Sequence, residues 1–415
     1  MRTMMMKRTI MAYMGAVSAL SLTPVVVAPT HAQQAATAGQ KAKQEAANLP
    51  DTLPLNRIQI LGTHNSYSQG VDPNIKAMMD ANAPSMHAMI GTMNEEARKD
   101  FLLAHPNDVT MSEALNYSYT SLTDQLNHGV RGLEIDINAD PEGGAYADPG
   151  AYKMLRAKGV TNLLPYDASA MHAPGLKVLH MADIDFRASC QTFRACLTEM
   201  KAWSDANPRH VPLFIMVEAK VSGGMFPREK PVPSFTDATY DEMDQTIIDI
   251  MGRDNVITPD DVLGRYPTLE KAVLAGNWPK LGDARGKFIF MLSTATGKDG
   301  ASAYLNNHAG LKGRMAFLDS TPGQDYAAFI LDDNALVRGK EIRDLVGKGY
   351  LVRSRADIET YEAKVNDLSR AKAAFDSGAQ IVSSDFIKPG NAYGTSYVVT
   401  LPGGGVARAM PAPRK

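Results

Sequence analysis

The chain carries the stretch Ile58-Gln59-Ile60-Leu61-Gly62-Thr63-His64-Asn65-Ser66-Tyr67, an apolar run that ends in an imidazole and an amide. Such a run is typical of a buried strand that delivers polar side chains to its carboxyl end. A second run, Gly132-Leu133-Glu134-Ile135-Asp136-Ile137, repeats the arrangement with two carboxylates. Because side chains alternate along a strand, Glu134 and Asp136 lie on one face.

Two further apolar runs end in the same kind of side chain. Val178-Leu179-His180 adds a second imidazole, and Phe214-Ile215-Met216-Val217-Glu218 adds a third carboxylate. Strand ends that supply two histidines, one asparagine and three acids predict a catalytic centre with a site for a hard cation.

The order of the apolar runs predicts a (β/α)₈ barrel of the TIM type in the α/β class. Helical stretches, among them 121–127, 193–206, 240–251 and 360–374, separate most of the strand candidates. In such barrels the active site lies at the carboxyl ends of the strands, where the polar residues stand. The segment 68–119 is too long for a plain loop and predicts an insertion after the first strand, helical around 94–103. The strand candidates are 58–61, 132–137, 177–180, 213–217, 288–292, 315–318, 350–352 and 380–382.

The N-terminus has the pattern of a secretory signal peptide. Basic residues precede an interrupted apolar run, 10–27, and Thr30-His31-Ala32 supplies the small residues of a cleavage site. We therefore expect a signal peptide over 1–32 with cleavage after Ala32, and export of the mature protein. An uncleaved anchor is the alternative, against which the short, interrupted run argues. We assign 33–50 to a linker, 51–400 to the barrel domain and 401–415 to a flexible tail.

The net charge and the two cysteines bear on the binding partners and on the redox state of the protein. A net charge of −2 gives no electrostatic reason to expect nucleic acid. Cys190 and Cys196 would share an oxidising compartment after export, and a disulfide needs a loop or a helix start at Cys190. A free buried pair stays open as the alternative.

Taken together, these motifs resemble the X-domain signature of phosphoinositide-specific phospholipases C, and the run from Cys190 to Pro208 is similar to the calcium-dependent bacterial branch. The resemblance covers roughly residues 53–392, almost the whole mature chain. Any one motif is weak, but the ordered set is specific. The stretches that carry it are 62–67, 129–136, 217–218, 190–208, 352–357 and 381–385.

The resemblance implies a secreted phosphodiesterase that cleaves phosphatidylinositol-type lipids through a cyclic inositol phosphate. It places His64 and His180 as the catalytic histidines. It also implies that Asn65, Glu134, Asp136 and Glu218 are calcium ligands, and an all-oxygen set without thiolate suits calcium better than zinc.

The chemistry needs groups that move protons beside a phosphodiester. The cation would screen phosphate charge and acidify a coordinated hydroxyl, and Glu134 or Asp136 would accept its proton. His180 would protonate the leaving glycerol oxygen and His64 would donate a hydrogen bond to the phosphate. His172 is the rival of His180. Lys220, Arg353 and Ser384 are candidate substrate contacts, although Lys220 would equally neutralise Glu218 and Arg353 would equally serve as a structural tie.

Two other functions compete with this interpretation. A glycerophosphodiesterase-like hydrolase of another phosphodiester usually shows His-Arg where this chain has His64-Asn65. A silent lipid- or sugar-binding barrel would not need both histidines and all four ligands. We expect a monomer that makes transient contact with a membrane surface. Methionines of the insertion offer an adaptable apolar surface for lipid, with packing onto the barrel as the alternative: Met78, Met79, Met86, Met89 and Met93.

Overall fold

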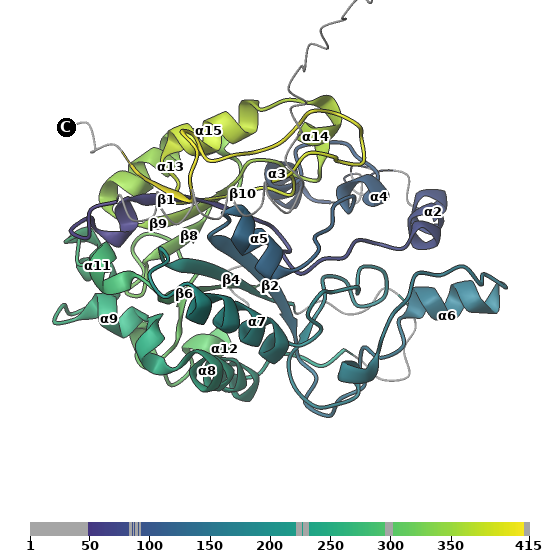
Figure 1. Cartoon of the computed structure of the whole chain (residues 1–415), viewed down its shortest axis with the longest axis horizontal. Helices are drawn as coiled ribbons and strands as arrows, with labels where there is room; N and C mark the ends of the chain where they lie inside the picture. Colours follow the sequence, from purple (N-terminus) through teal and green to yellow (C-terminus); the bar gives the residue numbers. More distant parts are fainter. Residues whose placement is uncertain are drawn as a thin grey trace, which may run out of the picture.

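A computed structural model describes residues 49–410, apart from 83, 84, 86, 88, 89, 91, 92, 221–225, 227–231 and 295–301. Within this part of the chain, parallel strands curl into a ring surrounded by helices (Figure 1). The pairing runs in the order β6-β4-β2-β1-β10-β9-β8; β7 pairs with β6, and a parallel bridge between Asp319 and Phe329 joins β7 to β8. The predicted barrel is thereby confirmed. The ring consists of β1 (Ile58–Gly62), β2 (Gly132–Asn138), β4 (Leu213–Ala219), β6 (Phe288–Thr294), β7 (Ala316–Leu318), β8 (Phe329–Leu331), β9 (Leu351–Arg355) and β10 (Ile381–Ser383).

The helices that cover the barrel begin at polar caps. The Ser121 hydroxyl accepts from the Asp124 N–H at the start of α5, and Thr192 accepts from the Ala195 N–H at the start of α7. Of the helices with apolar periodicity, α7 has the predicted bounds. The longer covering helices are α5 (Leu122–His128), α7 (Phe193–Ala206), α8 (Asp237–Met251), α13 (Ala335–Lys348) and α15 (Ser369–Ser377).

Shorter elements fill the loops between these units. The helices are α2 (Pro73–Asn82), α3 (Glu95–Ala104), α4 (Met111–Ala114), α6 (Gly150–Ala157), α9 (Pro259–Leu263), α10 (Leu269–Leu274), α11 (Leu281–Ala284), α12 (Ser302–Leu305) and α14 (Tyr361–Val365). The 3₁₀ turns are η1 (Leu55–Arg57), η3 (Ser169–Met171), η4 (Arg253–Asn255) and η6 (Ala309–Leu311). The remaining strands are β3 (Lys177–Val178), β5 (Val256–Ile257) and β11 (Ala407–Ala409).

Three local predictions need correction. The run 177–180 is not a barrel strand, because β3 pairs antiparallel with the end of β2. The place in the ring belongs instead to β8, which no strand candidate covered. The predicted helix 360–374 is divided into α14 and α15 at Asn366, which adopts a left-handed conformation with φ of 57°.

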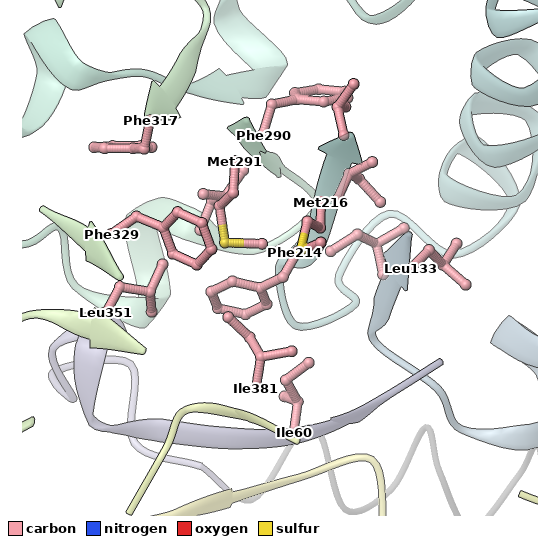
Figure 2. Packing of buried hydrophobic residues seen from close by; sticks show 14 of the residues in the cluster. Ile60, Leu133, Phe214, Met216, Phe290, Met291, Phe317, Phe329, Leu351 and Ile381 are labelled. Atoms are coloured by element: carbon pink, nitrogen blue, oxygen red, sulfur yellow. The ribbon is translucent and has the colours of Figure 1, made fainter. Parts of the chain in front are cut away.

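One set of inward-pointing side chains explains why core and site share the barrel. Ile60, Phe214, Met216, Met291 and Ile381 pack together inside the ring (Figure 2). Because side chains repeat every two residues, the same face of each strand continues upward into polar groups near its carboxyl end. Those groups are Glu134 and Asp136 on β2, Glu218 on β4, and Arg353 and Arg355 on β9.

The insertion 68–119 forms α2, α3 and α4. Asn94 caps α3 by accepting from the Ala97 N–H, at the place where a helix was predicted. Met79 is buried and packs in a satellite cluster with Ile75, and Met78 is partly buried against it. These two methionines therefore support the packing alternative, whereas Met86 and Met89 lie outside the described residues.

The predictions for the two ends of the chain have different outcomes. The predicted signal peptide and most of the linker, residues 1–48, lie outside the described residues. Strand β11 falls in the stretch expected to be a flexible tail, yet it pairs antiparallel with β1 and so ties residues 407–409 to the barrel. Among the described helices, none combines the length and the apolar character that crossing a membrane requires.

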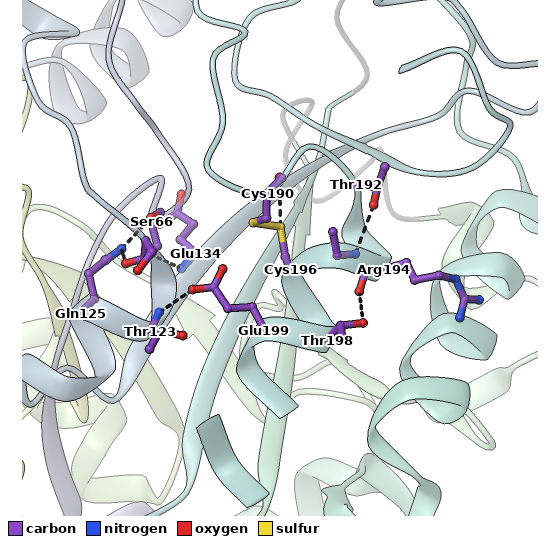
Figure 3. The surroundings of a disulfide bond; sticks show 12 residues. Ser66, Thr123, Gln125, Glu134, Cys190, Thr192, Arg194, Cys196, Thr198 and Glu199 are labelled. Atoms are coloured by element: carbon purple, nitrogen blue, oxygen red, sulfur yellow. Dashed lines mark hydrogen bonds between the residues drawn. A yellow bond between two sulfur atoms is a disulfide. The ribbon is translucent and has the colours of Figure 1, made fainter. Parts of the chain in front are cut away.

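The two cysteines form a disulfide at the start of α7 (Figure 3). Cys190 lies in the loop before Thr192, and Cys196 lies in the first turns of the helix, with 5.2 Å between their Cα atoms. The loop position of Cys190 removes the mismatch of faces that a continuous helix would impose.

Candidate active site

Three carboxylates converge at the mouth of the barrel. Ligand oxygens of Glu134, Asp136 and Glu218 all lie within 4.8 Å of one another. Asp136 and Glu218 occupy directly paired positions on the neighbouring strands β2 and β4, and Glu134 stands one inward-facing position earlier. The strand register therefore builds the cluster, as the alternation of the sequence predicted.

Burial and mutual repulsion shift the pKa values of these three carboxylates. Loss of solvent raises the pKa of Glu134 to about 8, although Arg353 opposes the rise. Burial likewise raises the pKa of Asp136, and the charge of Glu218 adds to the rise. At Glu218 burial acts upward as well, but the Lys220 ammonium outweighs it and the pKa is lowered. Three acids in so small a volume favour a bound cation over three free charges.

Two side chains of the protein supply positive charge to the cluster. The Lys220 Nζ lies 2.6 Å from Glu218 Oε1 and 3.0 Å from Asp136 Oδ2. An Arg353 guanidinium nitrogen lies 2.5 Å from Glu134 Oε2, and its other terminal nitrogen lies 2.5 Å from Asp333 Oδ1. Arg353 therefore holds Glu134 in place and also pairs with a second carboxylate, that of Asp333.

Asn65 is turned towards the cluster by two tyrosines. Its backbone is left-handed, with φ of 44°, a conformation that asparagine tolerates better than most residues. Its Nδ2 donates to the Tyr117 hydroxyl at 2.7 Å, and the Tyr67 hydroxyl donates to its Oδ1 at 3.3 Å. Burial and the charge of Asp136 together raise the pKa of Tyr67, which places Tyr67 between Asn65 and Asp136.

His64 links the cluster to a second acid. Its Nδ1 lies 3.1 Å from Asp385 Oδ1, while its Nε2 lies 3.9 Å from Glu134 Oε1. Arg355 donates to the other Asp385 oxygen at 3.0 Å, and Tyr119 donates to Oδ1 at 3.3 Å. Burial, followed by the charges of Arg355 and Arg353, lowers the pKa of His64 well below its usual value. The Nδ1 atom of His64 thus lies beside both Asp385 Oδ1 and, at 3.3 Å, an Arg355 guanidinium nitrogen, while its Nε2 is on the side of Glu134.

His180 forms a second pair of imidazole and carboxylate. Its Nδ1 lies 2.9 Å from Asp185 Oδ2, and its backbone N–H donates to the Asp185 carbonyl at 3.1 Å, which closes a tight loop. His180 lies near enough to Asp136 and Glu218 that its charge acts to lower the pKa of both acids. His172, its rival in the sequence, is exposed in the preceding loop.

The remaining predicted residues have different surroundings. Ser384 is fully buried, where its hydroxyl donates to Asp357 and accepts from the Phe386 N–H. It therefore belongs to the interior behind Asp385. Sequence reasoning gave no roles to Asp185, Tyr67 and Tyr117. The spacing of Asp185 five residues after His180 was visible in the sequence, but the reversal of the chain that joins them was not.

The oxygen-only donors fit calcium. Both Asp136 oxygens are buried, and the Lys220 ammonium lies 3.0 Å from Oδ2. Calcium takes carboxylate and amide oxygens at about 2.3–2.6 Å, and Glu134, Asp136 and Glu218 offer carboxylate oxygens close to one another. Zinc sites are built mainly from histidine nitrogen and cysteine sulfur, whereas the group of potential metal ligands here consists of the carboxylates of Glu134, Asp136 and Glu218.

Comparisons with known proteins agree with this geometry. Residues 53–411 match the sequence model of a family described as Phosphoinositide phospholipase C, Ca2+-dependent. No protein of curated function matches the chain in sequence. Among solved structures, a calcium-dependent phosphoinositol-specific phospholipase C from a Pseudomonas species aligns with a TM-score of 0.50 and 15% identity, over 88% of this chain and 99% of that chain. This match supports the shared fold.

A second solved structure is similar at a lower score. The Ca2+-dependent phosphatidylinositol-specific phospholipase C of Streptomyces antibioticus aligns with a TM-score of 0.48 and 18% identity, over 80% of this chain and 95% of that chain. The family match spans nearly all of the described residues, and it includes both histidines and all the carboxylates of the cluster.

Proposed function

Because the chain belongs to the family of Ca2+-dependent phosphoinositide phospholipases C, we propose that it is an exported enzyme that cleaves phosphatidylinositol-type lipids to a cyclic inositol phosphate. The single observation that supports this proposal best is the convergence of the three carboxylates between two imidazoles, each of which is held by its own acid. A lipid-binding barrel without activity would have no use for two such pairs.

Each imidazole is suited to one proton transfer. His180 presents Nε2 to the site while Asp185 compensates the charge of a protonated ring, so we assign it to protonate the leaving glycerol oxygen. We assign His64, whose Nε2 is on the side of Glu134, to accept the proton from the attacking hydroxyl, a role that requires the tautomer in which Nδ1–H is donated to Asp385. This division differs from the sequence hypothesis, in which His64 donated to the phosphate and Glu134 or Asp136 acted as the base.

The carboxylates and the arginines prepare the site for a phosphodiester. Calcium, when bound, supplies the positive charge that stabilises the phosphoryl oxygens as the leaving group departs. Arg353 and Tyr67 hold Glu134 and Asn65 in the orientation in which their oxygens face one point. Arg355, paired with Asp385 beside His64, adds positive charge on the side where the phosphate must lie.

The cyclic route needs no external nucleophile, because the substrate itself carries the attacking hydroxyl. A hydroxyl adjacent to the phosphoester attacks the phosphorus and forms the second ester bond, its proton passes to His64, and the glycerol oxygen leaves with a proton from His180. A substrate without an adjacent hydroxyl cannot follow this path.

Phosphorus NMR tests the proposal directly. Phosphatidylinositol in mixed micelles with calcium should give a cyclic diester resonance before any monoester, and phosphatidylcholine and soluble glycerophosphodiesters should react much more slowly. A glycerophosphodiester or a choline lipid cleaved faster than phosphatidylinositol would replace the cyclic route by direct attack of water. The protein would then be a glycerophosphodiesterase-like hydrolase of another phosphodiester.

A further inference from the structure

Lys220 holds an unusual position within the carboxylate cluster. It follows β4 directly, two residues after Glu218, and its side chain points back to the same face. Its Nζ is 2.6 Å from Glu218 Oε1 and 3.0 Å from Asp136 Oδ2, so it ties together two of the three carboxylates. Only 12% of the side chain is exposed.

An ammonium at these distances and a calcium ion bound by the same oxygens exclude each other. Calcium needs the Asp136 and Glu218 oxygens at about 2.3–2.6 Å, so it would stand in nearly the volume that Nζ now fills. Two cations so close together would also repel each other strongly in a site of low dielectric. Calcium that takes Asp136 Oδ2 and Glu218 Oε1 as ligands therefore displaces Lys220 from at least one of its two carboxylates.

The other basic side chain of the cluster has no such conflict. Arg353 contacts the far oxygen of Glu134, Oε2, and is held by Asp333 at 2.5 Å on its other side. Its planar guanidinium on β9 is fixed at both ends, whereas Lys220 carries its charge on a flexible four-carbon stem at the end of a strand. Arg353 can stay when a cation enters, and Lys220 can move.

We propose that Lys220 is an internal competitor for the calcium site and thereby sets the calcium affinity of this chain. The inference rests on the proposed function, because it takes Asp136 and Glu218 as calcium ligands. In the calcium-free protein the ammonium neutralises the two acids and keeps the cluster from repelling itself. On calcium binding the ammonium exchanges for the divalent ion, so part of the calcium binding energy is used to break at least one of the two ion pairs of Lys220.

Calcium titration calorimetry on the full chain and its variants tests this exchange without any substrate. Lys220→Met removes the competing charge at similar length, and we expect its calcium Kd to fall by about 10-fold or more relative to the unchanged protein. Lys220→Arg restores a cation and should bind calcium no more tightly than the unchanged protein. Lys153→Met removes an exposed lysine that pairs with Asp148 on the surface, and it should leave the Kd unchanged.

Thermal unfolding provides the second measurement and the check on folding. Without calcium, Lys220→Met should unfold at a lower temperature than the unchanged protein, because its acids lack a counter-ion, and calcium should raise that temperature by more than it does in the unchanged protein. If the variant does not fold without calcium, Lys220→Gln is measured in the same way.

The outcomes separate the inference from the function on which it rests. An unchanged or weaker Kd in both neutral variants overturns the competition while leaving the calcium site intact. Absence of calcium binding in every variant and in the unchanged protein overturns both the competition and the ligand assignment. Hydrolysis assays take no part in this test, so failure of the proposed lipid specificity would leave its result unaffected.

Discussion

Asp185 and Asp385 give each histidine a single orientation. A carboxylate beside Nδ1 favours the tautomer with the proton on that nitrogen and leaves Nε2 for the substrate, and at His180 the Asp185 carboxylate is the partner of Nδ1. The Asp185 carboxylate pairs with His180 at 2.9 Å, and among the described residues no hydrogen bond joins it to the carboxylate cluster. It is therefore a positioning residue whose role can be separated from that of the calcium ligands.

Asp185→Asn should lower kcat about 10²- to 10⁴-fold with little change in KM, because the amide presents its own N–H to the ring and favours the wrong tautomer. Steady-state hydrolysis of phosphatidylinositol measures the loss, and the profile of kcat against pH should change shape. Asp148→Asn, at an exposed acid paired with Lys153, is the matched control and should keep full activity. A kcat within threefold of the unchanged protein would remove Asp185 from the mechanism.

His210 is a buried histidine that serves stability instead of catalysis. Its Nδ1 donates to the Val211 carbonyl at 2.6 Å, and its Nε2 accepts from the Ser204 hydroxyl at 2.8 Å, so both nitrogens are satisfied in the neutral ring. Burial lowers its pKa to about 4. Since the unfolded chain takes up this proton near pH 6.5 and the folded chain does not, stability is full above pH 6.5 and falls as the pH drops towards 4.

The contribution of His210 amounts to about 3 kcal/mol between these limits, given 1.36 kcal/mol per pKa unit. Urea unfolding at pH 7.5 and pH 4.5 should show that His210→Gln loses less stability on acidification than the unchanged protein does. Equal losses in the two proteins would mean that carboxylates alone account for the acid sensitivity.

The disulfide acts on one element, the start of α7. A closed loop with a sequence separation of 6 restricts the unfolded chain by about 2 kcal/mol in the loop-entropy treatment. Cys190→Ala with Cys196→Ala should therefore lower the free energy of unfolding by about that amount, measured by denaturant titration. Adding reductant to the unchanged protein should reproduce the loss, and reductant should leave the double variant unaffected. A loss under 0.5 kcal/mol would show that α7 is held by packing alone.

Elements with a strong apolar period could be predicted, and those without one could not. The bounds of α7 followed from its apolar spacing and the Thr192 cap. Strand β8 was missed because Phe329–Leu331 is only three residues long and follows a segment of turns. The run 177–180 is equally apolar, but β3 within it pairs antiparallel with β2. Local hydrophobicity does not reveal the direction of a strand relative to its neighbours.

One part of the candidate site could likewise be predicted from the sequence, and another part could not. The cluster of Glu134, Asp136 and Glu218 followed from alternation and from the common edge of parallel strands. The partners of the histidines did not, because His64 meets Asp385 across 321 positions of sequence. Only closure of the ring, which places β10 beside β1, brings these two residues together.

The proposed calcium site joins the strands that begin the barrel. Asn65 follows β1, Glu134 and Asp136 lie on β2, and Glu218 lies on β4, three strands that are neighbours in the ring. A cation that binds these residues binds only the folded chain, since the unfolded chain does not hold them together. Calcium should therefore stabilise the whole molecule as well as permit the reaction.

Removal of calcium tests both effects in one preparation. At a calcium concentration 100 times the Kd, linkage gives about 2.7 kcal/mol of added stability, which corresponds to about 3–4 °C in Tm for a domain of this size. Excess chelator should lower the Tm by that amount and abolish hydrolysis, and added calcium should restore both. Magnesium should restore less, because it demands near-octahedral geometry and keeps its waters. Full hydrolysis in excess chelator would exclude the metal from the reaction, and Lys220 between Asp136 and Glu218 would then be the resident cation of the site.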